Sequence, residues 1–345
     1  MSSAVSSQQS RVVRYNSANE LISQVGHALF HREAECNIML PLIQKLQTRP
    51  SFATSQFCVT PSAPVVDDFW LVVQSSSNEV EFVLSCTNGP LGGYPVFIWC
   101  GRPVSTMSLP FIQQKMSLLC QHLLKAVPSP KRVFSVFAPT KVTRAFATAW
   151  STLTDFDIVE SPYYHATFSS VTAQTLLPAS PAKFELPQYS LRQATNADEA
   201  GVAELCYTFA LTGEPFILDH AGAQKEARCL ISQGQAYVCE VGGSIVCLVA
   251  VTRSSTNHAT ITKVVTHPGF GGQGWAKRLV REVCLRLLHE EGKKSVLLYV
   301  ALDNVPATKA YKGVGFAGLL GDAQDPNMDT EWLELGFDGT DLGHW

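Results

Sequence analysis

Residues 264–276, VVTHPGFGGQGWA, combine the residue types and spacing of an anion-binding turn. A β-rich run ends in His267-Pro268, and a helix is predicted to begin at about Trp275. Between them lie Gly269, Gly271, Gly272 and Gly274. Because glycine has no Cβ, such a loop can bring several backbone N–H groups close to one anion, and the helix N-terminus adds roughly half a positive charge. The pattern predicts a phosphate cradle, and an ordinary tight turn is the alternative.

Two common nucleotide-binding motifs do not fit this stretch. No Lys-Ser or Lys-Thr pair follows the glycines, which disfavours an ATPase phosphate loop. The spacing also differs from G-x-G-x-x-G followed by an acidic residue about 20 positions on, which disfavours a nicotinamide-binding fold. The predicted cradle is therefore of another kind.

A second motif lies in residues 298–316, LYVALDNVPATKAYKGVGF. Together the two segments resemble the GNAT superfamily of acyl-CoA N-acyltransferases, whose motifs read V-x-P-x-x-[RQ]-G-x-G-x-A and N-x-x-A-x-x-x-Y-x-x-x-G-F. The family usually has Arg or Gln where this chain has Gly271, and its loss would weaken pyrophosphate binding. Most of the family's contacts there are backbone N–H groups, which remain. The matching residues are Pro268, Gly272, Gly274, Ala276, Asn304, Ala307, Tyr311, Gly315 and Phe316.

The predicted elements of the C-terminal half follow the order of the GNAT fold. Gly242-Gly243 predicts a hairpin turn, and apolar residues at helical spacing predict an amphipathic helix behind the cradle. The predicted fold class is α/β, with a mixed sheet of parallel and antiparallel strands of the α+β type. Strands are predicted at 189–194, 235–241, 244–251, 259–266, 294–300, 316–320 and 331–337, and helices at 195–211, 221–232, 275–290 and 306–312.

The N-terminal half repeats this order of elements but lacks the cradle. Residues 102–110, RPVSTMSLP, contain no glycine cluster. We therefore expect tandem GNAT-like domains, with an intact acyl-CoA cradle in the C-terminal one; an unrelated α+β domain in front is the alternative. Helices are predicted at 18–46, 109–126 and 140–150, and strands at 69–74, 79–87, 94–101, 132–139 and 163–171. The expected parts are a disordered tail 1–11, a degenerate domain 12–176, a Pro-rich linker 177–187 and a GNAT domain 188–345.

The resemblance implies acetyl-CoA as cosubstrate and assigns its contacts. The strand before the cradle would hold the pantetheine arm as an added strand would, in a splay between this strand and residues 294–300. Lys277 or Arg278 could add charge near a phosphate, or could be solvated helix residues. Asn304 would contact the CoA arm or only cap its helix. The implied cofactor-binding residues are Val264, Val265, Thr266, Gly271, Gly272, Gln273, Gly274, Trp275, Ala276, Lys277, Asn304 and Ala307.

Tyr311 is the predicted catalytic acid, with a packed core aromatic as the alternative. In the reaction that the resemblance implies, an amine attacks the thioester carbonyl and a thiolate leaves. A phenol of pKa about 10 is protonated at pH 7 and can donate to a thiolate of pKa about 8–9.

The general base stays open, because residues 258–266 contain no Asp or Glu. Glu214 and His220, with Asp219 between them, lie where the family often binds its acceptor. His258, His267 and ordered water are alternatives. Acidic residues within 321–334 could attract an amine cation, or could form a solvated loop; they include Asp322, Asp325 and Asp329.

Composition excludes several classes of function. A net charge of −3 with 16% charged residues disfavours nucleic acid as a partner. The sequence contains no run of about 18 apolar residues, so we expect no membrane-spanning helix. The N-terminus lacks the apolar region of a secretory signal. The ten cysteines form no C-x-x-C pair, which favours buried thiols in a reducing cytoplasm and no metal.

The sequence thus predicts a cytoplasmic N-acetyltransferase. It would move an acetyl group from acetyl-CoA to a primary amine of a small molecule, by direct attack in a ternary complex. The expected oligomeric state is monomer or homodimer, and the N-terminal domain would form the acceptor site or a dimer face. The alternatives are a protein lysine or N-terminal acetyltransferase and a catalytically silent acyl-CoA-binding or scaffold protein.

Overall fold

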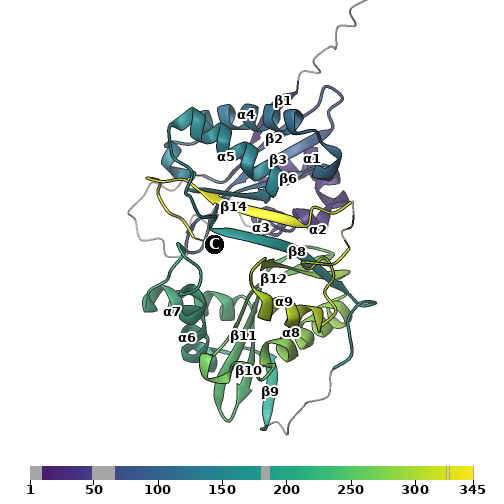
Figure 1. Ribbon diagram of the computed structural model, residues 1–345, viewed down its shortest axis with the longest axis vertical. Coiled ribbons are helices and arrows are strands. Elements are labelled where there is room, and N and C mark those ends of the chain that lie inside the picture. Colours follow the sequence, from purple (N-terminus) through teal and green to yellow (C-terminus); the bar gives the residue numbers. More distant parts are fainter. Residues whose placement is uncertain (1–9, 49–66, 180–186, 324, 326, 345) are drawn as a thin grey trace, which may run out of the picture. The chain divides into compact units, whose positions relative to one another are not determined.

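The computed structural model describes residues 10–48, 67–179, 187–323, 325 and 327–344. It contains two compact units (Figure 1). Unit 1 is Met1–Tyr164 with Pro326–Trp345, and unit 2 is His165–Asp325. Each unit is built around a mixed β-sheet, and the two sheets have the same strand order and polarity.

The sheet of unit 2 has the order β8-β13-β12-β11-β10-β9. The β12–β13 pair is parallel, and the other pairs are antiparallel. The predicted hairpin is confirmed, because Gly242 and Gly243, both with positive φ, join β10 to β11. The strands are β8 Tyr164–Thr172, β9 Tyr189–Gln193, β10 Ala236–Val241, β11 Ser244–Ser254, β12 His258–Thr266 and β13 Ser295–Ala301.

Two pairs of helices cover opposite faces of this sheet (Figure 1). Alternate strand residues explain the division, since Val238 and Leu248 pack against α6 and α7, whereas Cys239 and Cys247 pack against α8 and α9. A capping box between Thr195 and Asp198 starts the 3₁₀ turn Asn196–Asp198 that leads into α6. The helices are α6 Glu199–Ala210, α7 His220–Ser232, α8 Trp275–Leu285, which continues as a π-helical turn Arg286–Glu290, and α9 Val305–Lys312.

Unit 1 repeats this architecture in the order β1-β2-β3-β6-β7-β14, with a parallel β6–β7 pair. Its strands are β1 Arg11–Tyr15, β2 Phe69–Gln74, β3 Val80–Cys86, β6 Val96–Cys100, β7 Ser135–Pro139 and β14 Glu331–Gly336, with a small hairpin of β4 Asn88–Gly89 and β5 Gly92–Gly93. Its helices are α1 Ala18–His31, α2 Glu33–Cys36, α3 Leu40–Gln47, α4 Leu109–Ala126 and α5 Thr140–Thr154.

The two units exchange a strand, which the sequence did not predict. β8 precedes the predicted linker but pairs with β13 in unit 2, from Ala166↔Ala301 to Thr172↔Ser295. β14 is the last strand of the chain but pairs with β7 in unit 1, from Trp332↔Pro139 to Gly336↔Ser135. Residues 163–171 therefore do not close the N-terminal sheet, and residues 331–337 do not close the C-terminal one.

Four smaller predictions about local structure need correction. Residues 316–320 form only an isolated bridge, Ser170↔Ala317, and not a strand. The predicted helix 18–46 is broken into α1, α2 and α3. Arg11, placed in the disordered tail, begins β1, while 1–9 lie outside the described residues. Leu177, placed in the linker, is bonded to Val314 and Arg281 of unit 2, and residues 180–186 again lie outside the described part.

Candidate active site

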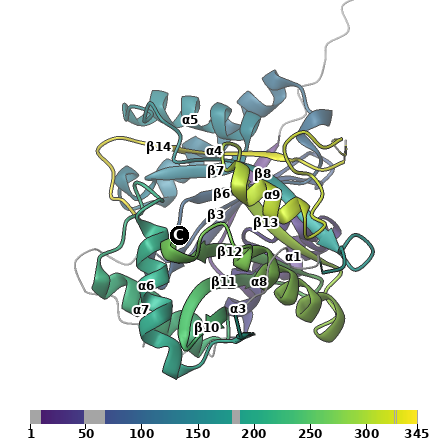
Figure 2. The ribbon, with the colours of Figure 1, turned by 60° about the horizontal axis from the view of Figure 1, so that its bottom comes forward.

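The parallel strands β12 and β13 separate partway along their length. Their pairing runs from His258↔Ser295 to Ile261↔Leu298 and ends there, although β12 continues to Thr266 and β13 to Ala301. The opposite edge of β12 stays paired with β11 as far as Thr266↔Cys247. The splay predicted from the sequence is therefore present, and Val264, Val265 and Thr266 lie on its β12 side. Figure 2 shows β12 beside β11 in the sheet of unit 2.

The glycine loop follows directly from the splayed end of β12. His267 turns the chain, because its Nδ1 accepts the Gly269 N–H at 3.1 Å, and a 3₁₀ turn Pro268–Phe270 follows. Gly272 and Gly274 have φ values of 75° and 80°, a region that glycine adopts without the steric cost of a Cβ. A Cβ on Gly274 would also lie 2.9 Å from Arg278 Nη1. Two of the glycines are thus required by the backbone itself.

The loop ends at the N-terminus of α8 with its backbone donors unused. Within the described part of the chain, no acceptor is found for the N–H groups of Gly272, Gln273, Gly274, Trp275 and Ala276. The N-cap residue, Gly274, makes no side-chain cap. Consecutive free N–H groups at a helix start form an anion site. The helix is held in place by Trp275, which is buried and lies 5.3 Å from the Tyr189 ring, centroid to centroid.

Gly271, one of two departures from the family motif (the other is Thr266 where the motif has Val), is not required by the backbone. It has φ −61° and ψ 154°, values that any residue adopts. A Cβ on Gly271 would have Pro268 O as its closest neighbour, at 3.5 Å, an ordinary contact. The family's Arg or Gln would therefore fit here.

The second motif positions α9 beside the cradle helix. Asn304 Oδ1 accepts the Ala307 N–H at 3.1 Å, so Asn304 caps α9, as one of its two predicted roles requires. Lys277 of α8 lies against the end of α9, since a Cβ on Gly313 would meet Lys277 Nζ at 2.7 Å. Lys277 is therefore partly buried rather than a freely solvated residue.

Tyr311, the predicted acid, is 8% exposed and belongs to the core cluster between α8, α9 and the sheet. Its ring centroid lies 5.7 Å from that of Phe316. Burial, with smaller contributions from Cys247 and Cys284, raises the pKa of Tyr311 well above its usual value. The phenol is thus protonated at neutral pH, as an acid must be, and it is also a packed core aromatic.

The predicted bases do not gather around Tyr311. Glu214 and His220 are exposed, in the loop between α6 and α7 and at the start of α7. His220 stacks on Tyr207 at 4.1 Å, and Asp219 caps α7 through the Gly222 N–H. His258 Nδ1 lies 2.7 Å from Ser295 Oγ at the other end of β12. None of these contacts joins a base to Tyr311.

Sequence reasoning missed one carboxylate beside β12. Glu226 of α7 holds Lys263 of β12 through both carboxylate oxygens, each 2.7 Å from Nζ. The Lys263 Nζ also lies 4.7 Å from the centre of the Phe209 ring. Burial, with Glu226 as a hydrogen-bond partner, raises the pKa of Cys206 to about 12. The two charged residues are far apart in sequence, so no local pattern signals the pair.

The acidic segment does not act as one cluster. Asp322 accepts from Lys312 Nζ at 3.0 Å and from the Leu319 N–H, and thereby ties the segment to α9. Asp325 is exposed at the end of unit 2. Asp329 belongs to unit 1, where it accepts the Val104 N–H. Asp329 is therefore not part of a solvated loop, since Val104 and Arg32 hold its carboxylate, and attraction of an amine by the acidic residues stays a prediction.

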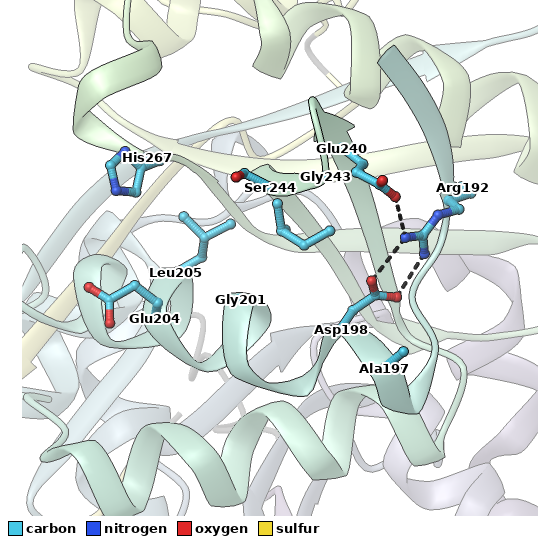
Figure 3. A pocket seen from close by; sticks show the side chains of 11 residues that line it. Arg192, Ala197, Asp198, Gly201, Glu204, Leu205, Glu240, Gly243, Ser244 and His267 are labelled. Atoms are coloured by element: carbon cyan, nitrogen blue, oxygen red, sulfur yellow. Dashed lines mark hydrogen bonds and ion pairs between the residues drawn. The ribbon is translucent and has the colours of Figure 1, made fainter. Parts of the chain in front are cut away.

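A pocket of about 490 Å³ lies under the start of the glycine loop, on the α6 side (Figure 3). At one end Arg192 pairs with Asp198 and Glu240, at 2.7 and 2.6 Å. The Arg192 guanidinium lowers the pKa of Asp198 well below its usual value. His267 and Glu204 line the other end, so the pocket adjoins the loop through His267.

Two further findings bear on the class of site. Across the described ranges, no group of His, Cys, Asp and Glu is arranged to hold a metal ion. No helix in that part of the chain has the length and apolar character needed to span a bilayer.

The splay, the glycine loop and the capped α9 are the features that the GNAT resemblance predicts, and a family model identifies the same family. The acetyltransferase (GNAT) family model matches residues 203–316, so this part of the chain belongs to that family. No curated protein matches the chain at a significant level.

Solved structures show that the fold extends over both units. A Drosophila protein aligns over 95% of this chain and 97% of its own, with 10% identity and a TM-score of 0.59. A GCN5-related N-acetyltransferase from Sphaerobacter thermophilus aligns over 97% and 98%, with 13% identity and a TM-score of 0.51. A tandem GNAT protein of the clavulanic acid biosynthesis pathway aligns over 97% and 100%, with 16% identity and a TM-score of 0.47. The strand order that the two units share and the full-length likeness to the first two structures confirm the predicted tandem GNAT-like fold.

Proposed function

We propose that this chain is a cytoplasmic N-acetyltransferase that moves the acetyl group of acetyl-CoA to a primary amine of a small molecule. The observation that carries the proposal is the splay of β12 from β13, which ends at a loop with unused N–H donors. An extended amide arm fits the open edge of a strand, and a pyrophosphate fits the N-terminus of α8. Both features lie in or beside the segment that belongs to the family.

In this proposal the backbone of Val264, Val265 and Thr266 holds the pantetheine amides, and the N–H groups of residues 272–276 hold the pyrophosphate, while the Gly271 N–H donates to Pro268 O. The amine nitrogen attacks the thioester carbonyl carbon, and the C–S bond then breaks. The nitrogen loses a proton to a base or to water, and the thiolate takes the proton of Tyr311. Burial keeps the phenol protonated but raises its pKa, so it is a weaker donor than an exposed phenol and gives its proton only to a basic thiolate.

Direct attack in a ternary complex agrees with the state of the thiols. Of the cysteines in the described part of the chain, Cys229 is half-buried and the others are buried. Burial raises the pKa of Cys239 to about 11 and that of Cys247 to about 12, so neither is a thiolate nucleophile at pH 7. Initial-rate lines that intersect when both substrates are varied would support the ternary complex, and parallel lines would contradict it.

Calorimetric titration of the intact protein with acetyl-CoA tests the site. We expect one binding site in unit 2, and Gly272→Glu and Gly274→Glu should abolish binding by placing a carboxylate among the donors. Gly292→Glu is the matched control for Gly272→Glu, because Gly292 has a similar positive φ of 69° and surroundings as open as those of Gly272 but lies after the far end of the helix. Absence of binding at millimolar acetyl-CoA would overturn the proposal.

A catalytically silent acyl-CoA-binding protein is the second candidate, favoured by the deep burial of Tyr311. Tyr311→Phe separates the two. For an enzyme we expect unchanged acetyl-CoA affinity and a loss of roughly 10²–10⁴ in turnover, the usual scale for one general acid. Unchanged turnover would remove Tyr311 from the mechanism. No turnover by the wild type with any amine or lysine peptide would favour the silent protein, and turnover with peptides alone would move the acceptor to protein.

A further inference from the structure

Unit 1 contains a loop that is the counterpart of the cradle. Residues 101–108 join the end of β6 to the start of α4, and residues 267–274 join β12 to α8, so the two loops have the same length. Both include a 3₁₀ turn, Val104–Thr106 in unit 1. The strands before them are also splayed, since the β6–β7 pairing ends at Phe97↔Phe137. Unit 1 therefore retains the framework of an anion site.

Several donors of this loop and of the first turn of α4 are used by the chain itself, although the N–H groups of Ser108 and Leu109 have no acceptor in the described part of the chain. Ser108 Oγ accepts the Phe111 N–H at 3.4 Å and caps α4, and Pro110 has no N–H to offer. The Val104 N–H donates to Asp329 Oδ1 at 2.8 Å. A carboxylate of unit 1 thus accepts from the loop at Val104, whose counterpart by position in unit 2 is Phe270, two residues before the unused donors of the cradle.

Asp329 is held from several sides. Its side chain is 10% exposed, and its Oδ2 lies 3.5 Å from Nη2 of Arg32, which also binds Glu35 at 2.6 Å. Trp332 Nε1 donates to the Asp329 carbonyl oxygen at 2.7 Å and fixes the backbone. Burial raises the pKa of Asp329, while Val104 and Arg32 act in the opposite direction.

The Arg32 guanidinium has more donors than its partners use. Its side chain is 9% exposed, and Nε and Nη1 are buried without a partner in the described part of the chain. A guanidinium presents its N–H groups as a planar fork that matches a carboxylate. Buried, unused donors of this kind are costly unless an acceptor can reach them.

We infer that Val104 and Arg32 form an internal anion site in unit 1 that Asp329 fills, and that a small carboxylate binds there when the Asp329 side chain is removed. With Asp329 on the Val104 N–H, this donor is closed to a phosphate, and under the proposed function of unit 2 we expect the chain to bind one acyl-CoA. The anion site itself does not depend on the proposed enzyme activity.

Chemical rescue of Asp329→Ala in the full chain tests the site. Removal of the carboxylate should lower the melting temperature by about 2–4 °C or more. Sodium formate should restore it in a saturable manner, whereas sodium chloride at equal ionic strength should not. Asp341→Ala, a change at an exposed acid of the same unit, and the wild type should show no formate-specific shift. Arg32→Met with Asp329→Ala should lose the rescue.

Two results would overturn the inference. One is a folded Asp329→Ala protein whose melting temperature does not respond to formate. The other uses the wild type and needs no folded variant: a second acetyl-CoA site per chain, seen by calorimetry and removed by Val104→Pro. If the protein bound no acetyl-CoA at all, that result would contradict the proposed function only. The formate test does not involve acetyl-CoA and would still decide the inference about Asp329.

Discussion

Loops 101–108 and 267–274 connect equivalent elements and differ in what satisfies their N–H groups. The loop of unit 2 reaches α8 through Gly272 and Gly274 at positive φ, which aims consecutive donors outward. The described loop of unit 1 has no residue at positive φ and ends in a serine cap. In unit 2 five consecutive N–H groups have no acceptor in the described part of the chain, whereas in unit 1 the chain accepts from Val104 and Phe111, and Pro110 removes one further donor. Retention of the fold does not therefore imply retention of the site.

The largest effect is expected when one unit is expressed without the strand that the other half of the chain contributes to its sheet. A fragment 188–345 lacks β8 and should fail to give a cooperative unfolding transition, because the β13 edge that includes buried Val296 and Leu298 would be exposed. Fragment 164–325 keeps β8 and is the matched comparison, expected to unfold cooperatively in urea. Cooperative unfolding and full acetyl-CoA affinity of fragment 188–345 would show that the exchange is dispensable.

A smaller effect is expected when unit 2 is given the proline of unit 1. Ala276 is at the second position of α8, as Pro110 is in α4. Proline is tolerated in a first helical turn but has no N–H, so Ala276→Pro should keep the fold and remove one donor. Loss of one charged hydrogen bond of about 1.5–3 kcal/mol would weaken acetyl-CoA binding roughly 10–100-fold. Calorimetry measures this, with Pro110→Ala as the control that should leave binding unchanged.

The sequence predicted the elements of the cradle because each has a local cause. His267-Pro268, the glycines and the apolar spacing of α8 act within a few residues of each other, and the structure bears out the splay and the turn that they imply. The exchange of β8 and β14 could not be predicted, because an alternating strand has the same pattern whichever sheet it joins.

Side-chain partners distant in sequence were also beyond prediction. Asp329 looked like part of a solvated acidic loop, and only the fold brings it to Val104 and Arg32. Glu226 likewise gave no local signal of its contact with Lys263. Sequence patterns report on the backbone of a site more readily than on charges that meet across it.

Placing the family's Arg at position 271 should raise the affinity of the unit 2 loop for acetyl-CoA by a modest amount. Gly271 has an extended backbone and room for a Cβ, so Gly271→Arg adds a positive charge without strain. Exposed charge pairs contribute about 0.2–1 kcal/mol, which corresponds to an affinity gain of up to about fivefold for acetyl-CoA. The equivalent change in unit 1, Ser105→Arg, should leave the affinity and the number of sites unchanged. A loss of affinity in Gly271→Arg would show that the glycine itself is needed.

The smallest predicted effect concerns the cost of an internal anion. The pKa of Asp329 is raised in the folded protein, chiefly by burial and also by Glu35, while Val104, Arg32 and Lys141 lower it. From the unfolded value of about 3.9 up to the raised value, the folded state binds more protons, so stability falls as the pH rises. Asp329→Asn keeps an acceptor for Val104 but does not titrate.

The stability of the wild type relative to Asp329→Asn should therefore decrease as the pH rises from about 4, and then become constant. Urea unfolding of both proteins at a series of pH values measures this difference. A difference that grows with pH would mean that unit 1 stabilises the charged carboxylate better than water does, and that the internal anion matches its site as a ligand would. If the stability of the wild type relative to Asp329→Asn decreases with pH, the charged Asp329 carboxylate lowers the free energy of unfolding. A diffusible ligand would not lower the stability of the protein when it is unbound.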